Sequence, residues 1–521
     1  MITLKSYLCD TWQAGSTEGA KLYNPATGEV IATAGTEGLD LAAALTYARD
    51  VGGAALRAMT FAERGAMLLD LSNEIHRHRA ELLELSERNT GTTHSDSKFD
   101  IDGATVTLAA YAKIGASLGQ AKFLLDGDGE QIGRSPRYHG QHIKVPLRGV
   151  AVHINAFNFP AWGFAEKAAC AWLAGMPVLC KPATSTALPA FRIAEILAAS
   201  GRLPKGAWSF LCGSVGDLLD HLSFQDVIAF TGSAETGMRI RGHRNVLEKS
   251  LRVNVEADSL NAVVLGPDVE RGSPCFELFL KELAREMAQK SGQKCTATRR
   301  VIIPESMVTA VAEDLEAELQ NYTFGIPTQD GVRVGTLATP DQISQVADGM
   351  EALGKVCDRA FGTPLARATT APALATPVAF ICRKPLETPL VHALEVFGPC
   401  VTLMPYDGTA ETAARLVAMG GGGLVASVYS DDLDFTGAML FEIAPYHGRL
   451  LLGSNRIAEY STGPGLVLPT LAHGGPGRAG GGLELGGLRG LNLYLQTCAV
   501  QGARPVLDRL LTSGPSTEAD A

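Results

Sequence analysis

Between residues 149 and 238 the chain alternates short apolar runs with longer segments whose apolar residues recur at helical spacing. Near-continuous apolar runs predict strands buried on both faces, and the helical spacing predicts helices that cover them. This order predicts a doubly wound parallel sheet, which binds ligands beyond the carboxyl ends of its strands. The predicted strands are 149–154, 178–180, 208–211 and 227–230, and the predicted helices are 165–175, 186–200 and short ones near Leu218 and Met238.

A second section of the same kind begins at 262–265 and predicts a second α/β domain. Its predicted helices are 276–291 and 308–319, and its later strands are 301–303, 378–382, 400–404, 425–429 and 450–452. Before the first section, apolar residues at near-helical spacing predict one helix over 61–88. A polar, glycine-containing stretch at 127–140 and a short strand at 143–145 predict a hairpin or arm that leaves the main body.

Composition narrows the class of protein. The 521 residues are 46% hydrophobic and 19% charged, which is typical of a globular enzyme with sizeable cores. A net charge of −10 gives no basic footprint for nucleic acid. No apolar run reaches the length of about 18–20 residues that would span a membrane. The first residues lack an export signal, and the ten cysteines show neither pairing nor metal-ligand spacing. We therefore expect a cytoplasmic protein without a metal site.

One thiol lies where a helical pattern ends. Cys295 stands in Ser-Gly-Gln-Lys-Cys-Thr at 291–296, directly before the predicted strand 301–303. A lone cysteine is most often a small buried core residue, but a nucleophile would need this kind of break. Gly292 lets the backbone bring Cys295 close to a ligand. Lys294 either favours the thiolate or lies on the surface as a solvated charge.

Two other motif matches lack the structural context that gives them meaning. Residues 475–480 fit the dinucleotide-binding glycine pattern but do not open a helix in a βαβ unit. Residues 349–355 approach a phosphate-binding loop, yet Val356 stands where a hydroxyl should hold magnesium. The glycine-dense segment 474–490 therefore has no assigned chemistry from these patterns.

Five segments together resemble the NAD(P)-dependent aldehyde dehydrogenase superfamily in residue type and order, over almost the whole chain. Five motifs in order are far more specific than any one of them. They are Asn-Ala-Phe-Asn-Phe-Pro at 155–160, Lys-Pro-Ala-Thr at 181–184, Phe-Thr-Gly-Ser-Ala-Glu-Thr-Gly at 230–237, Gly-Gln-Lys-Cys-Thr at 292–296 and Glu-Val-Phe-Gly-Pro at 395–399.

The resemblance implies an aldehyde dehydrogenase-like α/β fold with three parts. A Rossmann-type cofactor domain is expected over 1–123 and 147–255, and a catalytic domain over 256–462. A β arm at 124–146 and 485–505 is expected to join subunits, so we expect a homodimer or a dimer of dimers. The polar end at 513–521 is expected to be disordered.

The resemblance also assigns catalytic roles. Cys295 matches the nucleophile that forms a thiohemiacetal with the aldehyde, and Asn158 matches the side-chain donor of the oxyanion hole. By itself Asn158 reads as a turn residue before Pro160. Glu256 matches the base that activates water, although Ala257 departs from the commoner Glu-Leu-Gly-Gly-Lys pattern. Lys167 and Glu484 match a polar shell that relays protons, and the competing interpretation is a solvent-exposed salt bridge.

For the cofactor, Lys181 and Ser185 match positions that meet the adenosine ribose or its phosphate. Many relatives that prefer NAD carry Glu at the position of Thr184. Without that carboxylate a 2′-phosphate is not repelled, so NADP is expected to be preferred over NAD. The remaining matches are Gly232 and Ser233 at the pyrophosphate, Gly213 at the adenine side, and Glu395 and Phe397 at the nicotinamide ribose and ring.

Three segments are similar to one subgroup, the semialdehyde dehydrogenases of aerobic aromatic degradation through CoA thioesters. They are 155–158, 254–261 and 475–481. The subgroup implies 3,4-dehydroadipyl-CoA semialdehyde of the benzoate (benzoyl-CoA) pathway as substrate, because no room is left after Leu511 for a fused hydratase domain. A phenylacetate-pathway enzyme, a broad-specificity aldehyde dehydrogenase and a non-catalytic binding or structural protein remain as alternatives.

Overall fold

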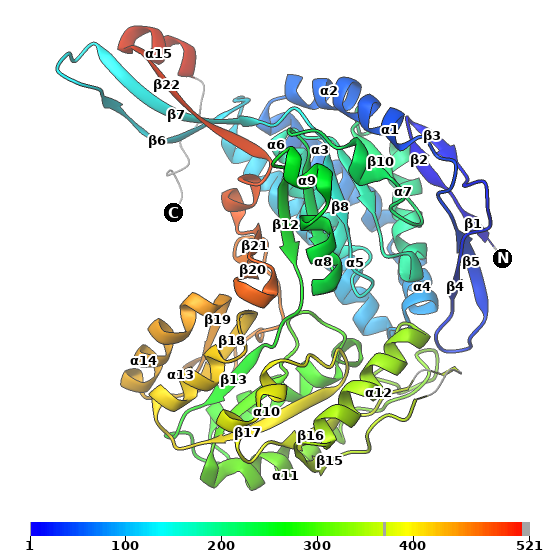
Figure 1. Cartoon of the computed structure of the whole chain (residues 1–521), viewed down its shortest axis with the longest axis vertical. Coiled ribbons are helices and arrows are strands. Elements are labelled where there is room, and N and C mark those ends of the chain that lie inside the picture. Colours follow the sequence, from blue (N-terminus) through cyan, green and yellow to red (C-terminus); the bar gives the residue numbers. More distant parts are fainter. Residues whose placement is uncertain (1, 368–370, 373, 513–521) are drawn as a thin grey trace.

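Two seven-stranded sheets organise the chain, one above the other in Figure 1. The structure is a computed structural model that describes residues 2–367, 371, 372 and 374–512. The segment 513–521, for which the sequence predicts disorder, lies outside the described residues. No helix in the described part of the chain is long and apolar enough to cross a membrane.

The first sheet is the predicted doubly wound one. Its strand order is β12-β11-β8-β9-β10-β2-β3, in which β12 to β10 run parallel and the short β2 and β3 extend the edge antiparallel. Every residue of β8 is buried, as a strand covered on both faces requires. The strands are β2 (Ser6–Leu8), β3 (Thr11–Gln13), β8 (Ala151–Ile154), β9 (Val178–Lys181), β10 (Trp208–Phe210), β11 (Val227–Thr231) and β12 (Arg252–Glu256).

Alternate residues of β9 belong to different cores, so helices cover both faces. Val178 and Cys180 pack with α3, α5, α6 and α7, whereas Leu179 packs with α1, α8 and α9. The helices are α1 (Leu41–Tyr47), α3 (Phe61–Arg77), α5 (His94–Leu118), α6 (Trp162–Ala174), α7 (Ala187–Ser200), α8 (Ala234–Arg241) and α9 (Arg244–Glu248).

The second sheet repeats this plan, as the second section of the sequence predicts. Its order is β15-β16-β17-β14-β13-β18-β19, and only β15 runs antiparallel. The strands are β13 (Ala262–Leu265), β14 (Arg300–Pro304), β15 (Asp358–Phe361), β16 (Val378–Ile381), β17 (Cys400–Tyr406), β18 (Gly423–Tyr429) and β19 (His447–Gly453). The covering helices are α10 (Pro274–Ala288) and α11 (Val308–Leu319) on one face, and α12 (Pro340–Gly354), α13 (Ala410–Ala418) and α14 (Leu433–Ile443) on the other.

The helices of the structure differ from the predictions in several places, and α1, α13 and α14 were not predicted. The predicted helix 61–88 is two helices, because the chain turns at His78 between α3 and α4 (Arg79–Thr90). The long helix α5 was not predicted. Its buried residues are polar as well as apolar, and Asp96 and Asp100 are among them. The buried polar residues interrupt the apolar periodicity that would predict a helix. The predicted helix 276–291 ends at Ala288, where a strained turn begins.

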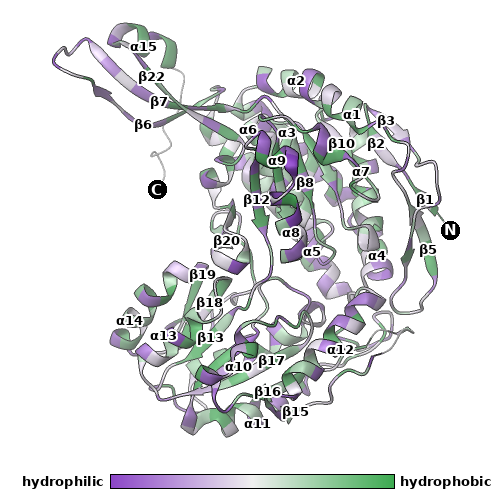
Figure 2. Ribbon diagram, in the orientation of Figure 1, coloured by the Kyte–Doolittle hydropathy of each residue, from purple (hydrophilic) through white to green (hydrophobic). Residues whose placement is uncertain are grey.

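A three-stranded antiparallel arm projects away from both sheets (Figure 1). It consists of β6 (Leu124–Gln131), β7 (Tyr138–Pro146) and β22 (Leu495–Ala503), and α15 (Arg504–Leu511) packs against it. Strand β7 is longer than the predicted 143–145, because its pairing with β22 continues to the arm's tip. Figure 2 shows green, hydrophobic residues along the central strands of the sheets and mixed colours along the arm.

A small hairpin lies between the two large sheets. Its strands are β20 (Ala472–Gly475) and β21 (Gly482–Leu485), within the glycine-dense segment. In the antiparallel register His473 lies opposite Glu484. Directly opposite residues of such a pair point to the same face, so the hairpin presents both side chains together.

Candidate active site

The thiol of Cys295 follows a turn that the rest of the fold holds in a strained conformation. Lys290 and Ser291 have φ values of 53° and 54°, and Gly292 has 69°. The Lys290 N–H donates to Asp96 Oδ2 at 3.0 Å. The Ser291 hydroxyl donates to the carbonyl of Gly335 at 2.8 Å. Tertiary contacts therefore fix a left-handed turn that L-residues rarely adopt.

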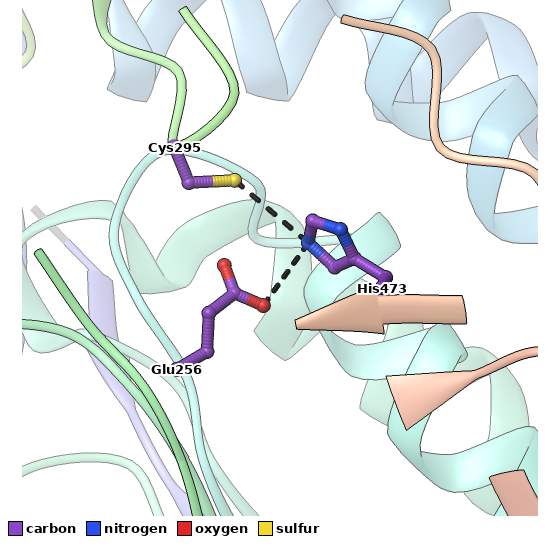
Figure 3. A group of neighbouring side chains, drawn as sticks. All are labelled: Glu256, Cys295 and His473. Atoms are coloured by element: carbon purple, nitrogen blue, oxygen red, sulfur yellow. Dashed lines mark hydrogen bonds and ion pairs between the residues drawn. The ribbon is translucent and has the colours of Figure 1, made fainter. Parts of the chain in front are cut away.

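Three side chains from distant segments meet at the thiol (Figure 3). Glu256 ends β12, Cys295 follows the strained turn, and His473 comes from β20. His473 Nε2 lies 4.0 Å from Cys295 Sγ and 3.0 Å from Glu256 Oε2. Sequence analysis missed His473. His473 stands in Leu-Ala-His-Gly-Gly, next to the glycine-dense segment, and no sequence motif links it to Glu256 or Cys295.

Burial and mutual attraction set the charges of this group. Burial opposes ionisation of Glu256, but the attraction of His473 prevails and holds the pKa of that carboxyl well below its usual value. Burial likewise opposes protonation of His473, and the attraction of Glu256 outweighs it and raises the pKa of the imidazole. Burial raises the pKa of the Cys295 thiol well above its usual value, and the Glu256 charge adds to the rise. The thiol therefore needs a proton acceptor at neutral pH.

The same three side chains could hold a metal ion, since their ligand atoms lie within 4.8 Å of one another. Thiolate, imidazole and carboxylate are also the donors that zinc prefers. The Glu256–His473 ion pair already satisfies two of them. The expectation of no metal at this site stays a prediction.

Asn158 faces the nucleophile loop. Its Nδ2 donates to the carbonyl of Gln293 at 3.1 Å, and it lines the same cavity as Cys295. Phe99, Phe159 and Trp162 line that cavity and contact one another edge to face, with ring centroids 5.0–6.0 Å apart. The entrance to the thiol is therefore apolar and aromatic, and Asn158 supplies a polar donor within it.

Lys167 and Glu484 form a buried cluster, so the alternative of a solvent-exposed salt bridge is wrong. Lys167 Nζ lies 2.9 Å from Glu166 Oε1 and 3.1 Å from Glu484 Oε2. Glu484 Oε1 accepts a hydrogen bond from Asn254 Nδ2 at 3.1 Å. Carboxylate oxygens of Glu166, Glu256 and Glu484 lie within 4.8 Å of one another. The Lys167 ammonium is thus the cation paired with Glu166 and Glu484 in this group of three carboxylates.

Lys294 is not a partner of the thiol, and it is not a surface charge either. Its side chain is fully buried, and Nζ lies 2.8 Å from Glu286 Oε1 and 2.8 Å from Gln289 Oε1. Both partners belong to the end of α10 and the turn after it. Lys294 therefore anchors the nucleophile loop from behind.

The residues expected at the adenosine lie together near the ends of β9 and β10. Burial lowers the pKa of Lys181, and no carboxylate pairs with its ammonium in the described part of the chain. The Thr184 hydroxyl donates to the carbonyl of Gly213 at 3.1 Å. The Ser185 carbonyl accepts a hydrogen bond from Asn89 Nδ2 at 3.0 Å. An unpaired cation beside a hydroxyl fits a ribose phosphate.

The cavity beside Thr184 also carries negative charge. Glu37, Asp40 and Asp217 line it together with Thr184. Glu37, Asp40 and Asp217 are all exposed, so solvent and salt screen their effect on a phosphate. The electrostatic potential at this cavity therefore depends on these three carboxylates as well as on the neutral side chain at position 184.

The predicted pyrophosphate turn follows β11. Ser233 caps α8, and its Oγ accepts from the Thr236 N–H at 3.3 Å. The Gly232 N–H donates to the Glu256 carbonyl at 3.1 Å, which places this turn beside the end of β12. The N-terminus of α8 thus opens at the carboxyl edge of the first sheet, where phosphates commonly bind.

Glu395 and Phe397 both contact Arg299, which donates to the carbonyls of the nucleophile loop. A Glu395 oxygen accepts from the Ser259 N–H at 3.3 Å, and another lies 3.7 Å from Arg299 Nε. Burial raises the pKa of the Glu395 carboxyl to about 8, against the attraction of Arg299. The Phe397 ring lies edge to face with Phe157 at 5.8 Å between centroids. A carboxyl group and an aromatic ring therefore lie together beside the nucleophile loop.

Comparison with known proteins bears on this geometry. A model of the aldehyde dehydrogenase family matches residues 12–500. The chain belongs to the aldehyde dehydrogenase family. This confirms the resemblance seen in the five sequence segments, and it makes the protein an oxidoreductase of aldehydes. NAD(P) is the cofactor of the aldehyde dehydrogenases.

Individual aldehyde dehydrogenases resemble the chain to different degrees. It is 44% identical over 478 residues to the 3,4-dehydroadipyl-CoA semialdehyde dehydrogenase of Aromatoleum evansii, which covers 91% of this chain and 93% of the relative. A solved lactaldehyde dehydrogenase superposes with a TM-score of 0.83 at 21% identity, over 96% of this chain and 99% of that one. A betaine aldehyde dehydrogenase mutant of Staphylococcus aureus, solved with NAD+, gives 0.81 at 22%, over 96% of both chains. These structures confirm the aldehyde dehydrogenase fold.

Proposed function

We propose that this enzyme oxidises 3,4-dehydroadipyl-CoA semialdehyde to the corresponding acid, with NADP as cofactor, in the aerobic degradation of benzoate through CoA thioesters. The observation that carries the substrate is the 44% identity to the relative of that name, over 91% of this chain and 93% of the relative. The half-buried thiol and the buried carboxylate and amide, which line one aromatic cavity, support the chemistry.

In the first step Cys295 Sγ attacks the aldehyde carbon. The S–H bond breaks as the new C–S bond forms, the carbonyl π electrons move to oxygen, and the thiol proton passes to that oxygen, giving a thiohemiacetal. Asn158 Nδ2 turns from the Gln293 carbonyl to the developing oxyanion and donates to it, together with the Cys295 N–H. One such donor contributes about 3–4 kcal/mol to the transition state.

NADP, when bound, supplies the hydride acceptor that converts the thiohemiacetal to a thioester. Lys181 and Ser185 would hold the adenosine side, Gly213 would line the adenine, and Thr184 would place no charge of its own against the 2′-phosphate. Gly232 and Ser233 present the helix N-terminus to the pyrophosphate. Glu395 and Phe397 hold the nicotinamide ribose and ring.

In the last step Glu256 accepts a proton from the water that attacks the thioester. Its position at the carboxyl end of β12, beside the thiol, suits a general base. Lys167 and Glu484 then pass the proton through the buried cluster. Cys295 leaves as the C–S bond breaks, and the carboxylic acid product departs.

We infer domain limits of 1–123 with 147–255 for the cofactor and 256–462 for catalysis. The arm at 124–146 and 485–505 joins two copies into a homodimer, because β6 and β22 are the edge strands of its three-stranded sheet. The enzyme acts in the cytoplasm and binds neither nucleic acid nor membrane.

NAD is the second candidate cofactor, and a specific observation favours it. Glu37, Asp40 and Asp217 line the cavity beside Thr184 and would repel a 2′-phosphate. The phenylacetate-pathway and broad-specificity alternatives share the same chemistry and differ only in the aldehyde. A non-catalytic role is the third alternative. The presence of Cys295, Glu256 and Asn158 in one cavity argues against it.

The test compares 3,4-dehydroadipyl-CoA semialdehyde with the same semialdehyde lacking CoA, each with NAD and NADP. We expect kcat/KM at least tenfold higher for the CoA-linked aldehyde with NADP, and no turnover in Cys295→Ala. Equal values for both aldehydes would favour the broad-specificity enzyme, and higher values with NAD would reverse the cofactor. Absence of turnover with every aldehyde would favour a non-catalytic protein.

A further inference from the structure

Two cysteines lie opposite each other at one edge of the second sheet. Asp358 of β15 pairs with Ile381 of β16 in antiparallel register. One residue further along the same ladder, Cys357 precedes β15 and Cys382 follows β16, so the two cysteines face each other across the strands. The Cys357 thiol donates a hydrogen bond to the Cys382 sulfur, and both side chains pack in the same hydrophobic core.

The backbone hydrogen bonds make this a closely spaced pair. The Cys357 N–H donates to the carbonyl of Leu353 in α12, and the Cys382 N–H donates to the carbonyl of Leu403 in β17, both at 2.9 Å. Neither amide donates to the opposite cysteine, which is typical of a non-hydrogen-bonded position, where Cα atoms are about 4.5 Å apart. Disulfides span Cα distances of about 4.4–6.8 Å. The two sulfurs can therefore bond to each other without a large movement of the backbone.

A second cross-strand contact holds the same strand ends together. Arg383 Nε donates to Asp358 Oδ2 at 2.6 Å, and both of these side chains are exposed. Cys357 is half-buried and Cys382 is 1% exposed. The pair therefore lies directly beneath the surface, with Cys357 on its outer side, where a molecule about as small as water can approach it.

The surroundings favour a thiolate at one of the two sulfurs. The hydrogen bond from Cys357, with further ones from the Thr388 hydroxyl and the Lys384 N–H, lowers the pKa of the Cys382 thiol to about 6, against its burial. The same hydrogen bond raises the pKa of the Cys357 thiol, so the shared proton stays on Cys357. A thiolate next to a second, resolving thiol is typical of redox-sensitive cysteines.

We propose that Cys357 and Cys382 form a reversible redox site, which hydrogen peroxide oxidises to a disulfide. The Cys382 sulfur attacks one peroxide oxygen, the O–O bond breaks, and the other oxygen leaves as hydroxide, giving a sulfenic acid. The Cys357 sulfur then attacks the Cys382 sulfur. The S–O bond breaks as the S–S bond forms, and the hydroxyl leaves as water with the proton of Cys357. Each sulfur loses one electron, and the two peroxide oxygens gain both.

The disulfide would tie β15, the antiparallel edge strand of the second sheet, to its neighbour β16. Such a bond closes a loop of chain and restrains the unfolded state more than the folded one. The oxidised protein should therefore resist unfolding better than the reduced protein. The proposal is independent of the proposed function, because neither cysteine has a part in catalysis or cofactor binding there.

The test treats the reduced full-length protein with hydrogen peroxide, alkylates the remaining thiols with iodoacetamide under denaturing conditions, and maps tryptic peptides without reduction. Cleavage places Cys357 in peptide 356–359 and Cys382 in peptide 368–383. We expect these two peptides to be joined, lighter than their sum by two hydrogen atoms, and separated again by dithiothreitol. The midpoint of thermal unfolding should rise by about 2 °C or more on oxidation.

Two variants and a matched control complete the experiment. Cys357→Ser and Cys382→Ser each keep a small polar group, and neither should form the cross-link or gain thermal stability with peroxide. Cys498→Ser is the control, because Cys498 is exposed on β22 of the arm. That variant should keep both the cross-link and the rise in the midpoint.

Alkylation of both Cys357 and Cys382 in wild type, under conditions that oxidise the exposed Cys498, would overturn the proposal. A cross-link from either residue to a different cysteine would also overturn it, as would an equal rise of the midpoint in the serine variants. If the serine variants fail to fold, the peptide map of the wild type decides by itself.

Discussion

The ammonium of Lys167 lies 3.1 Å from the carboxylate of Glu484, with only 1% and 4% of these side chains exposed to solvent. Burial raises the pKa of Glu484 to about 7, against the attraction of Lys167, and the charges of Glu166 and Glu256 add to the rise. Glu484 is therefore poised to exchange a proton near neutral pH. A carboxyl group of this kind, next to a water-activating base, can carry a proton away from the site.

The first prediction concerns Glu484→Gln. As pH rises through about 7 the wild-type carboxyl loses its proton and becomes an acceptor, so kcat should rise with pH between 6 and 8. The amide cannot titrate, so the variant should show a flat profile and a kcat lower by about 10²-fold at pH 8. Glu282→Gln is the control, since Glu282 is a buried carboxylate that accepts from Ser461 and Tyr429 instead. A variant profile that still rises with pH would contradict the relay.

The second prediction separates the two halves of the reaction at Glu256. Glu256→Gln should release one NADPH per active site in a rapid burst and then stall as the thioester. The reason is that thioester hydrolysis needs a base and hydride transfer does not. Stopped-flow absorbance and intact-protein mass spectrometry would measure the burst and the acyl adduct. Steady turnover at the wild-type rate would show that another base activates the water.

Cofactor preference depends on the charge at position 184. Thr184→Glu should lower kcat/KM for NADP by about 10²-fold, because two charges about 4 Å apart near a protein surface repel by roughly 4 kcal/mol before screening. The value for NAD should change little or improve. Thr184→Gln is the isosteric neutral control and should keep the NADP activity. If both variants lose NADP activity equally, shape rather than charge decides the preference.

The nucleophile turn should tolerate no side chain at Gly292. A Cβ there would lie 2.4 Å from the Gly398 carbonyl oxygen, so Gly292→Ala must displace the backbone that carries Cys295. We expect a loss of activity above 10²-fold and a lower midpoint of urea unfolding. Gly201→Ala is the matched control, because Gly201 is left-handed, with φ of 64° and ψ of 13°, and has nothing within 4 Å of the added Cβ. That variant should lose only the roughly 1–2 kcal/mol of a left-handed residue. Similar losses in both would show that conformation, not the close contact, matters.

Much of the fold follows from patterns along the chain. The apolar runs at 149–154 and 262–265 predict buried parallel strands, because a strand covered on both faces has no polar side. Helix α5 escaped this reasoning since Asp96 and Asp100 are buried on it. Asp100 accepts from the N–H groups of Ala161 and Trp162, and Asp96 accepts from that of Lys290. Polar residues with tertiary partners look like solvent-facing ones until the partners are known.

The candidate site divides in the same way. Cys295, Glu256 and Asn158 stand in segments whose residue types and order identify a family. The sequence by itself therefore determined the family, the doubly wound fold and these three candidate site residues. His473 and Glu166 carry no such signal, because their contacts with the site depend on a hairpin and a helix packed from elsewhere. Only the tertiary structure decided that Lys294 is anchored away from the thiol and that Lys167 and Glu484 are buried. Charge partners and burial are properties of contacts between distant segments, which no local pattern specifies.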